Sequence, residues 1–275
     1  MRINYYWRVV MALGAAAALT AVTAGQTAKP PQGSPNVTLI DDLVVANRIL
    51  ANEGILDGLG HVSVRSLQRP DHFFQSRDLA PGLVTAADIV EYDLDGNAVN
   101  PKAPVGVRER YIHAAIYKAR PDVNSVVHSH MPSVLPFTDS SVALRPMYHM
   151  AGFLVPGVPV WEIRKVQGQV GMLVDNNKAG ASLAQALGDK TVVLMRGHGA
   201  AIVGTTVPDA VSNAIFLDVD ARVQAQAIAF GGNISYLTQA DVGPPTANQQ
   251  PAAQPGAPGY YPRSWGIWKQ KAMGK

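Results

Sequence analysis

The stretch Ser125-Val126-Val127-His128-Ser129-His130 decides how the rest of the chain is interpreted. Its β-branched residues are typical of a strand, and side chains two apart on a strand point to the same face. The imidazoles of His128 and His130 are therefore expected to converge on one point. Two neutral imidazoles held side by side are the start of a divalent metal site, although a polar strand face is the other interpretation of this pair.

Two residues distant in the sequence extend this candidate site. Glu109 lies at the start of a helix predicted over residues 107–119, and His198 lies in a turn between two predicted strands. Gly197 and Gly199 flank His198, and glycine lets the backbone bend tightly and lets a metal or substrate approach closely. Taken singly, Glu109 could be a solvated carboxylate favoured by the helix dipole, and His198 a simple turn residue. The combination with the histidine pair favours a metal site.

These residues, in this order and spacing, resemble the class II aldolase/adducin family. The resemblance extends from about Asp41 to about Leu237 and includes the motifs Gly60-His61-Val62-Ser63-Val64-Arg65 and Arg196-Gly197-His198-Gly199. It implies an α/β fold with a central, mainly antiparallel sheet flanked by helices, and a ring-like homotetramer with sites at subunit interfaces. It also implies an acid/base at Glu109 and a divalent ion, Zn²⁺ or Mn²⁺, whose ligands are Glu109, His128, His130 and His198.

The pattern of apolar residues and turn signals predicts a similar architecture. Apolar residues at helical spacing predict helices, alternating or β-branched runs predict strands, and their mixture favours a largely antiparallel sheet covered by helices. The predicted helices are 39–56, 107–119, 178–187 and 212–230, and the predicted strands are 60–65, 73–76, 89–94, 125–130, 191–196 and 200–204.

Composition excludes some classes of protein. The 275 residues are 47% hydrophobic and 16% charged, which is ample for one sizeable core. The net charge is only +3 and no basic block with interleaved aromatic residues occurs, so nucleic-acid binding has no support. The chain has no cysteine, so any metal must take nitrogen and oxygen ligands.

The N-terminal residues differ in character from residues 39–240, which form the predicted domain. Residues 1–28 have a basic start and an uncharged, alanine-rich run over 9–25, which is typical of a secretory signal peptide. An uncleaved anchor is the alternative, but the run is shorter than the ~20 residues of a membrane-spanning helix. Cleavage would leave a linker, 29–38, and a periplasmic or secreted protein without a stable membrane span.

The C-terminal part divides into two segments. Residues 241–259 are rich in proline, glutamine and alanine and are expected to be flexible or extended. Residues 260–275 return to aromatic and basic character, with Trp265 and Trp268 close together. Two such tryptophans are usually buried, so we expect packing on the parent domain rather than a separate interaction motif.

The substrate is inferred from departures from the pattern of the family's sugar-phosphate aldolases. His61 stands where those enzymes carry an asparagine, Gln75-Ser76-Arg77-Asp78 replaces a Thr-Gly turn, and Val107-Arg108 replaces a Ser-Ser pair. Donors for a phosphate dianion are thereby largely lost, whereas an arginine matches a planar carboxylate with two parallel hydrogen bonds. Each arginine alone could be a surface ion pair, and His61 a strand-end histidine. We expect a small carboxylate substrate, contacted by His61, Ser63, Ser76, Arg77 and Arg108.

Met147-Tyr148-His149 is the second departure. The aldolases carry His-Tyr here, with the tyrosine donating a proton from a neighbouring subunit, so an imidazole now stands at the donor's place. In this respect the chain resembles the family's decarboxylase branch. The sequence therefore predicts a divalent-metal-dependent lyase that decarboxylates a hydroxylated aromatic or heterocyclic acid, with Glu109 or His149 as the proton donor. An aldolase acting on a sugar or sugar phosphate, a pentose-phosphate epimerase and a non-catalytic adducin-like binding domain are the alternatives.

Overall fold

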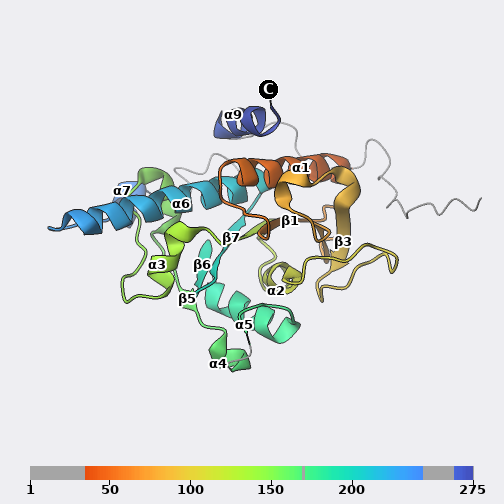
Figure 1. Ribbon diagram of the computed structural model, residues 1–275, viewed down its shortest axis with the longest axis horizontal. Coiled ribbons are helices and arrows are strands. Elements are labelled where there is room, and N and C mark those ends of the chain that lie inside the picture. Colours follow the sequence, from red (N-terminus) through yellow and green to blue (C-terminus); the bar gives the residue numbers. More distant parts are fainter. Residues whose placement is uncertain (1–34, 169–170, 244–262, 275) are drawn as a thin grey trace, which may run out of the picture.

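A seven-stranded sheet runs through the centre of the protein (Figure 1). The structure is a computed structural model that describes residues 35–168, 171–243 and 263–274. The strands lie in the order β3-β2-β1-β4-β7-β6-β5, and each neighbouring pair is antiparallel except β5 with β6. Their bounds are β1 His61–Arg65, β2 His72–Ser76, β3 Ile89–Asp93, β4 Ser125–Ser129, β5 Val160–Trp161, β6 Val192–Met195 and β7 Gly199–Gly204. The predicted fold class, a mainly antiparallel sheet flanked by helices, is confirmed.

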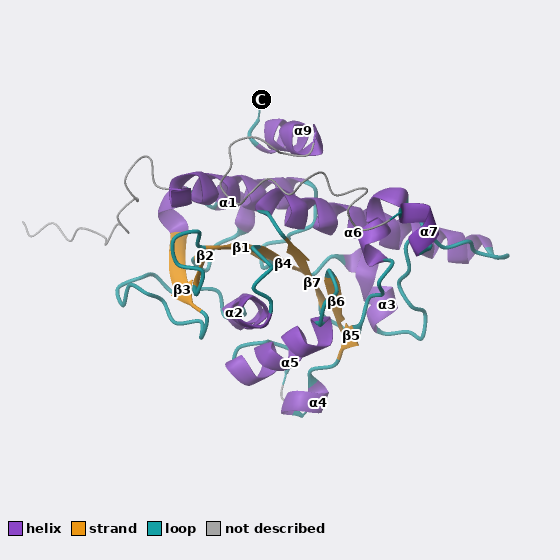
Figure 2. Cartoon of the chain, turned by 180° about the vertical axis from the view of Figure 1, so that it is seen from behind, coloured by secondary structure: helices purple, strands orange, loops and turns teal. Residues whose placement is uncertain are grey.

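Helices cover both faces of this sheet (Figure 2). One layer contains α1 and α6, and the opposite layer contains α2 and α5. The helices and helical turns are α1 Pro35–Asn52, η1 Pro81–Leu83, η2 Ala86–Asp88, α2 Arg110–Ala119, η3 Pro132–Val134, α3 Leu135–Thr138, η4 His149–Leu154, α4 Arg164–Gln167, α5 Asn177–Leu187, α6 Val207–Phe230, α7 Gln239–Val242 and α9 Arg263–Ala272.

The strands separate two hydrophobic clusters, because alternate side chains point to opposite faces of the sheet. Val62 and Val127 belong to the cluster under α1 and α6, whereas Val126 belongs to the cluster under α2 and α5. His61 and His128 are the strand neighbours of Val62 and Val127, so their side chains point to the opposite face of the sheet, toward the α2 layer. The candidate site thus lies on the α2 side of the sheet.

The C-terminal helix α9 packs on the outside of α1 (Figure 1). Trp265 and Trp268 are both buried there, and the Trp268 ring lies 6.0 Å from the Phe216 ring of α6. The expected packing of this aromatic segment on the parent domain is what the structure has for residues 263–274. A helix that carries two buried tryptophans adds apolar contact area to the layer beneath it.

Several element boundaries differ from those predicted. The first helix starts at Pro35 and ends at Asn52, so residues 35–38 are helical and not linker. The helix predicted from residue 107 starts at Arg110. The last long helix starts at Val207, because the Thr206 hydroxyl accepts a hydrogen bond from Asp209 N and caps the helix five residues before the predicted start.

Some predictions fall on residues that the structure does not describe. The predicted signal peptide 1–28 lies outside the described residues, as do residues 29–34 of the predicted linker and 244–259 of the proline-rich segment. Residues 241 and 242 of that segment belong to α7. Among the described residues, no helix combines the length and the apolar character that crossing a membrane requires.

Candidate metal centre

The end of β4 brings the first two imidazoles together. His128 is fully buried on the strand, and His130 follows one residue after the strand ends at Ser129. The Nε2 atoms of His128 and His130 lie 3.0 Å apart. The convergence predicted from their spacing is thus present in the structure.

The turn between β6 and β7 carries the third imidazole. His198 Nε2 lies 3.2 Å from His130 Nε2. Gly197 has a φ of +61°, a left-handed conformation that favours glycine, and its N–H donates to Thr138 Oγ1 over 3.0 Å. Arg196 is held by Asp139 at 2.8 Å, so both residues before His198 are anchored to the 138–139 segment.

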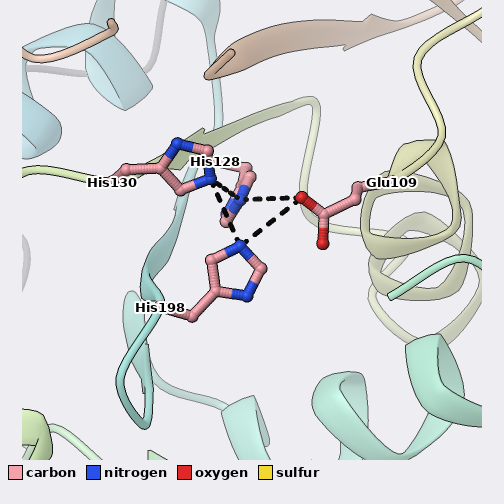
Figure 3. A group of neighbouring side chains, drawn as sticks. All are labelled: Glu109, His128, His130 and His198. Atoms are coloured by element: carbon pink, nitrogen blue, oxygen red, sulfur yellow. Dashed lines mark hydrogen bonds and ion pairs between the residues drawn. The ribbon is translucent and has the colours of Figure 1, made fainter. Parts of the chain in front are cut away.

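Glu109 supplies an oxygen from the opposite side of the site (Figure 3). It occupies the N-cap position of α2, and its Oε2 lies 3.5 Å from the Nε2 atoms of His128 and His198. Its Oε1 accepts a hydrogen bond from Val174 N over 2.9 Å. Glu109 is therefore a buried, oriented carboxylate and not a solvated residue of the first helical turn.

Electrostatics keep this carboxylate ionised. Burial alone would raise the pKa of Glu109, but hydrogen bonds and charge interactions with His128 and His198 outweigh burial and lower it. Burial lowers the pKa of His130, and the adjacent imidazoles of His128 and His198 lower it further. An ionised carboxylate is the protonation state in which glutamate binds a divalent metal.

The four side chains fit a divalent ion. One ligand atom from each of Glu109, His128, His130 and His198 lies within 4.8 Å of the others. Tetrahedral coordination with bonds of about 2.1 Å places ligand atoms roughly 3.4 Å apart, which is close to the separations described above. Without a shared cation, lone pairs of neighbouring imidazoles aimed at each other would repel.

Outer hydrogen bonds select the nitrogen that each imidazole offers. His128 Nδ1 is 3.1 Å from Ala200 O, and His130 Nδ1 is 3.3 Å from Asp57 Oδ2. A ring N–H donated to an outer oxygen leaves Nε2 with its lone pair directed toward the metal. His198 Nδ1 is buried and has no hydrogen-bond partner among the described residues.

The residues predicted to contact substrate are placed differently from one another. His61 is buried beside His128, with ring centroids 5.0 Å apart. Ser63 is fully buried, and its hydroxyl makes internal contacts, with His113 Nδ1 and the Tyr117 hydroxyl. Ser76 is also buried, at the end of β2.

The two predicted arginines and His149 lie outside the cluster. Arg77 Nε pairs with Asp88 at 2.7 Å, and Arg108 pairs with Asp175 at 2.9 Å. His149 is exposed at the start of η4, where its ring lies against Tyr148, and the structure records no contact between His149 and the metal-ligand residues of the same chain. Within one chain, His149 therefore makes no contact with the four candidate metal ligands.

Sequence reasoning missed His113 and Tyr117, which are both buried beside the site. His113 Nε2 lies 2.6 Å from His61 Nδ1. The signal was available, because residues four apart on a helix share a face and these two follow Glu109 at that spacing. Burial lowers the pKa of His113 to about 3, so the residue is neutral.

Comparison with known proteins identifies the family. A family model described as "Class II Aldolase and Adducin N-terminal domain" matches residues 41–225. The chain is 44% identical over 189 residues to "Decarboxylase tropJ" of Talaromyces stipitatus, covering 64% of this chain and 71% of that protein. It is 35% identical over 214 residues to a 3,4-dihydroxyphthalate decarboxylase of Arthrobacter keyseri, covering 73% of this chain and 83% of that protein.

Solved structures agree with this assignment. An L-fuculose 1-phosphate aldolase from Glaciozyma antarctica PI12 matches 91% of this chain and 96% of its own, with a TM-score of 0.67 and 25% identity. The chain belongs to the class II aldolase and adducin family, and the resemblance inferred from the sequence is confirmed.

Proposed function

We propose that the protein is a divalent-metal-dependent carbon–carbon lyase that decarboxylates a hydroxylated aromatic or heterocyclic carboxylic acid. The observation that carries the proposal is the meeting of a carboxylate and three imidazoles in a chain whose relatives include two decarboxylases. The ligand residues are Glu109, His128, His130 and His198.

The metal would stabilise negative charge on the substrate, and the protein would hold the metal ligands in place. A divalent ion, Zn²⁺ or Mn²⁺, would supply a Lewis acid that stabilises negative charge on substrate oxygens. Ala200 O and Asp57 orient two of the imidazoles, and Val174 N orients the Glu109 carboxylate. Such preorganisation makes an electrostatic site effective, because the polar groups need not rearrange during the reaction.

A proton donor is required after CO₂ leaves, because the ring carbon must be protonated. Glu109 is one candidate: its Oε2 faces the cluster, and its ionised carboxylate would first accept the proton of the substrate hydroxyl and then donate it to the ring carbon. His149 is the other, and its exposed position would serve a site on a neighbouring subunit of a homo-oligomer, a tetramer by family resemblance. Mixing subunits that carry Glu109→Gln with subunits that carry His149→Phe would restore activity only if each site draws on two chains.

Recognition of the substrate carboxylate is best assigned to Arg108. Its side chain is 67% exposed and its only recorded partner among the described residues is Asp175, which is itself 40% exposed. An exposed ion pair of this kind contributes little free energy, so the guanidinium can turn to a substrate at small cost. Arg77 is less available, because Asp88 also accepts hydrogen bonds from Thr85 and holds the pair in a turn.

The alternative activities make opposite use of these residues. A sugar-phosphate aldolase or an epimerase requires a phosphate site, for which the hydroxyl donors are replaced here by arginines. An adducin-like binding domain requires no metal ligands, yet all four candidate ligands are present and oriented. The cluster therefore favours an enzyme over a binding domain.

The test is a screen of metal-loaded protein against hydroxylated benzoates, phthalates and pyridine carboxylates, with released CO₂ as the readout. Wild-type protein is expected to release CO₂ from at least one of these acids, and His128→Ala is expected to release none. Sugar phosphates are assayed in parallel for aldol cleavage. Robust cleavage of a sugar phosphate, without CO₂ release from any of the acids, would show that the protein is an aldolase and not a decarboxylase.

A further inference from the structure

A chain of buried polar side chains connects the helix α2 to the strand beside the metal cluster. The Tyr117 hydroxyl is 2.7 Å from Ser63 Oγ, and Ser63 Oγ is 2.6 Å from His113 Nδ1. His113 Nε2 is in turn 2.6 Å from His61 Nδ1. All four residues are buried, with His61 the most exposed at 2%, so these contacts exclude water.

The direction of the hydrogen bonds follows from the Tyr117 end. The hydroxyl proton of a buried tyrosine must have an acceptor, and Ser63 Oγ is the side-chain acceptor that the structure provides for it. The serine then accepts from Tyr117 and donates its own proton to His113 Nδ1. A histidine that accepts at Nδ1 carries its proton on Nε2, so His113 donates to His61 Nδ1.

The other end of the chain agrees with this direction. The Gln75 amide nitrogen lies 3.0 Å from His61 Nδ1. With the amide oriented as it is in the structure, its NH₂ group donates to His61 Nδ1, which then carries no proton. The direction set from Tyr117 therefore places the proton of neutral His61 on Nε2, and the Gln75 contact is consistent with it.

That proton has no partner within the described part of the chain. His61 Nε2 is buried and lacks a hydrogen-bond partner there, although buried N–H donors are nearly always paired. His61 and His128 are opposite each other in the pairing of β1 with β4, and their rings lie 5.0 Å apart. The unpaired donor thus lies next to the imidazole that begins the metal cluster.

We infer that Tyr117, Ser63 and His113 are positioning residues that fix His61 as an N–H donor for an anionic oxygen of the ligand bound at the cluster. The identity of that ligand, an enolate- or carboxylate-bearing acid, rests on the proposed function. A histidine with a purely structural role would have both ring nitrogens satisfied, as His113 has. In His61, Nδ1 has hydrogen-bond partners, whereas the Nε2–H donor has none among the described residues.

The tautomers can be read directly by NMR on the full chain labelled with ¹⁵N-histidine and stripped of metal. His61→Gln and His113→Gln identify the two signals. In the wild-type protein we expect His61 and His113 both to carry the proton on Nε2. Ser63→Ala removes the donor to His113 Nδ1, so a second tautomer of His113 is expected to appear. Tyr92→Phe is the control. Tyr92 is as deeply buried as Tyr117 and belongs to the same hydrophobic cluster under α2 and α5, but it lies outside this chain of hydrogen bonds.

The donor role is tested by adding 2-hydroxybenzoate or oxalate to the Zn²⁺-loaded protein, where the His61 Nε2–H signal is expected to shift. A proton on His61 Nδ1, unchanged tautomers in Ser63→Ala, or a His61 signal that responds to neither anion would overturn the inference. None of these readouts uses turnover. A failure of the decarboxylase proposal would instead appear in the CO₂ assay, so the two outcomes are distinguishable.

Discussion

Gly199 passes so close to Ser129 that a Cβ atom added to the glycine would lie 2.0 Å from the Ser129 carbonyl oxygen. The contact joins the start of β7 to the end of β4, and it therefore fixes the distance between His198 and His128. The φ of Gly199 is +156°, at the edge of the range that side chains avoid. A backbone approach of this kind is available only to glycine.

Gly199→Ala is accordingly expected to separate β4 from β7 and to destabilise the protein by about 2 kcal/mol or more, as overpacked positions do. Denaturant unfolding followed by circular dichroism measures this change. Gly266→Ala is the matched control, because a Cβ there meets no atom within 4 Å and the residue lies in a helix. Equal stability of Gly199→Ala and the wild type would contradict the close contact.

Asp220 determines a second expected effect, on the dependence of stability on pH. The side chain is buried on α6, and its Oδ1 accepts hydrogen bonds from the backbone N–H groups of Met147 and Tyr148. Burial raises the pKa of Asp220, and these two hydrogen bonds only partly oppose it. The folded state therefore binds the Asp220 proton more tightly than the unfolded state does.

The sign follows from linkage. With a raised folded-state pKa, the contribution of Asp220 is most favourable below the ordinary pKa of 3.8 and decreases as the pH rises through the folded-state pKa. Asp220→Asn keeps an oxygen acceptor for both N–H groups without burying a charge. We expect this variant to be at least as stable as wild type at neutral pH, with the advantage shrinking near pH 4. A large loss of stability at neutral pH would show that the charge itself is needed.

Arg108→Ala is expected to raise KM and to leave kcat nearly unchanged. The rise in KM should correspond to roughly 2–3 kcal/mol of lost binding free energy, which is the contribution of a hydrogen bond to a charged group. The reason is the proposed carboxylate contact, which operates in substrate binding. Arg164→Ala removes another exposed, ion-paired arginine and serves as the control. Steady-state kinetics on the acid found by the CO₂ screen provides the measurement, and an unchanged KM for Arg108→Ala would remove this residue from the substrate site.

Export of the protein remains a proposal, based on the basic start and the uncharged run 9–25. Cleavage by a signal peptidase is expected to give a new N-terminus between Gly25 and Lys29, which mass spectrometry of natively expressed protein would detect. Recovery of intact Met1 in a soluble cytoplasmic fraction would count against export.

The local sequence pattern was sufficient to predict six of the seven strands and the converging imidazoles, whereas the two-residue strand β5 was not predicted. Alternation along Ser125–Ser129 fixes which side chains share a face, and the spacing of His128 and His130 follows from it. The alternation of residues along a strand does not tell which side chains of other elements pack against each face of the sheet. Ser63 was expected to contact the substrate, whereas the Tyr117 hydroxyl that it contacts belongs to a helix and lies 54 residues away in the sequence.

The ion pairs show the same limit. Arg77 and Arg108 were expected to contact a substrate carboxylate, with an ion pair as the alternative for each, and in the structure each has an aspartate partner, Asp88 and Asp175. The Asp175 partner is brought close only by the packing of α2 against α5. Packing of this kind depends on the tertiary fold, and a single sequence contains no local signal for it.

The metal content of the purified protein tests the central claim most directly. Elemental analysis after mild purification is expected to find about one divalent ion per chain in the wild type and in His72→Ala, because His72 pairs with Asp71 outside the cluster. His128→Ala and His198→Ala are expected to retain the fold, checked by circular dichroism, and to lose the ion. A wild-type protein that carries no metal and binds none when Zn²⁺ or Mn²⁺ is added would contradict the account.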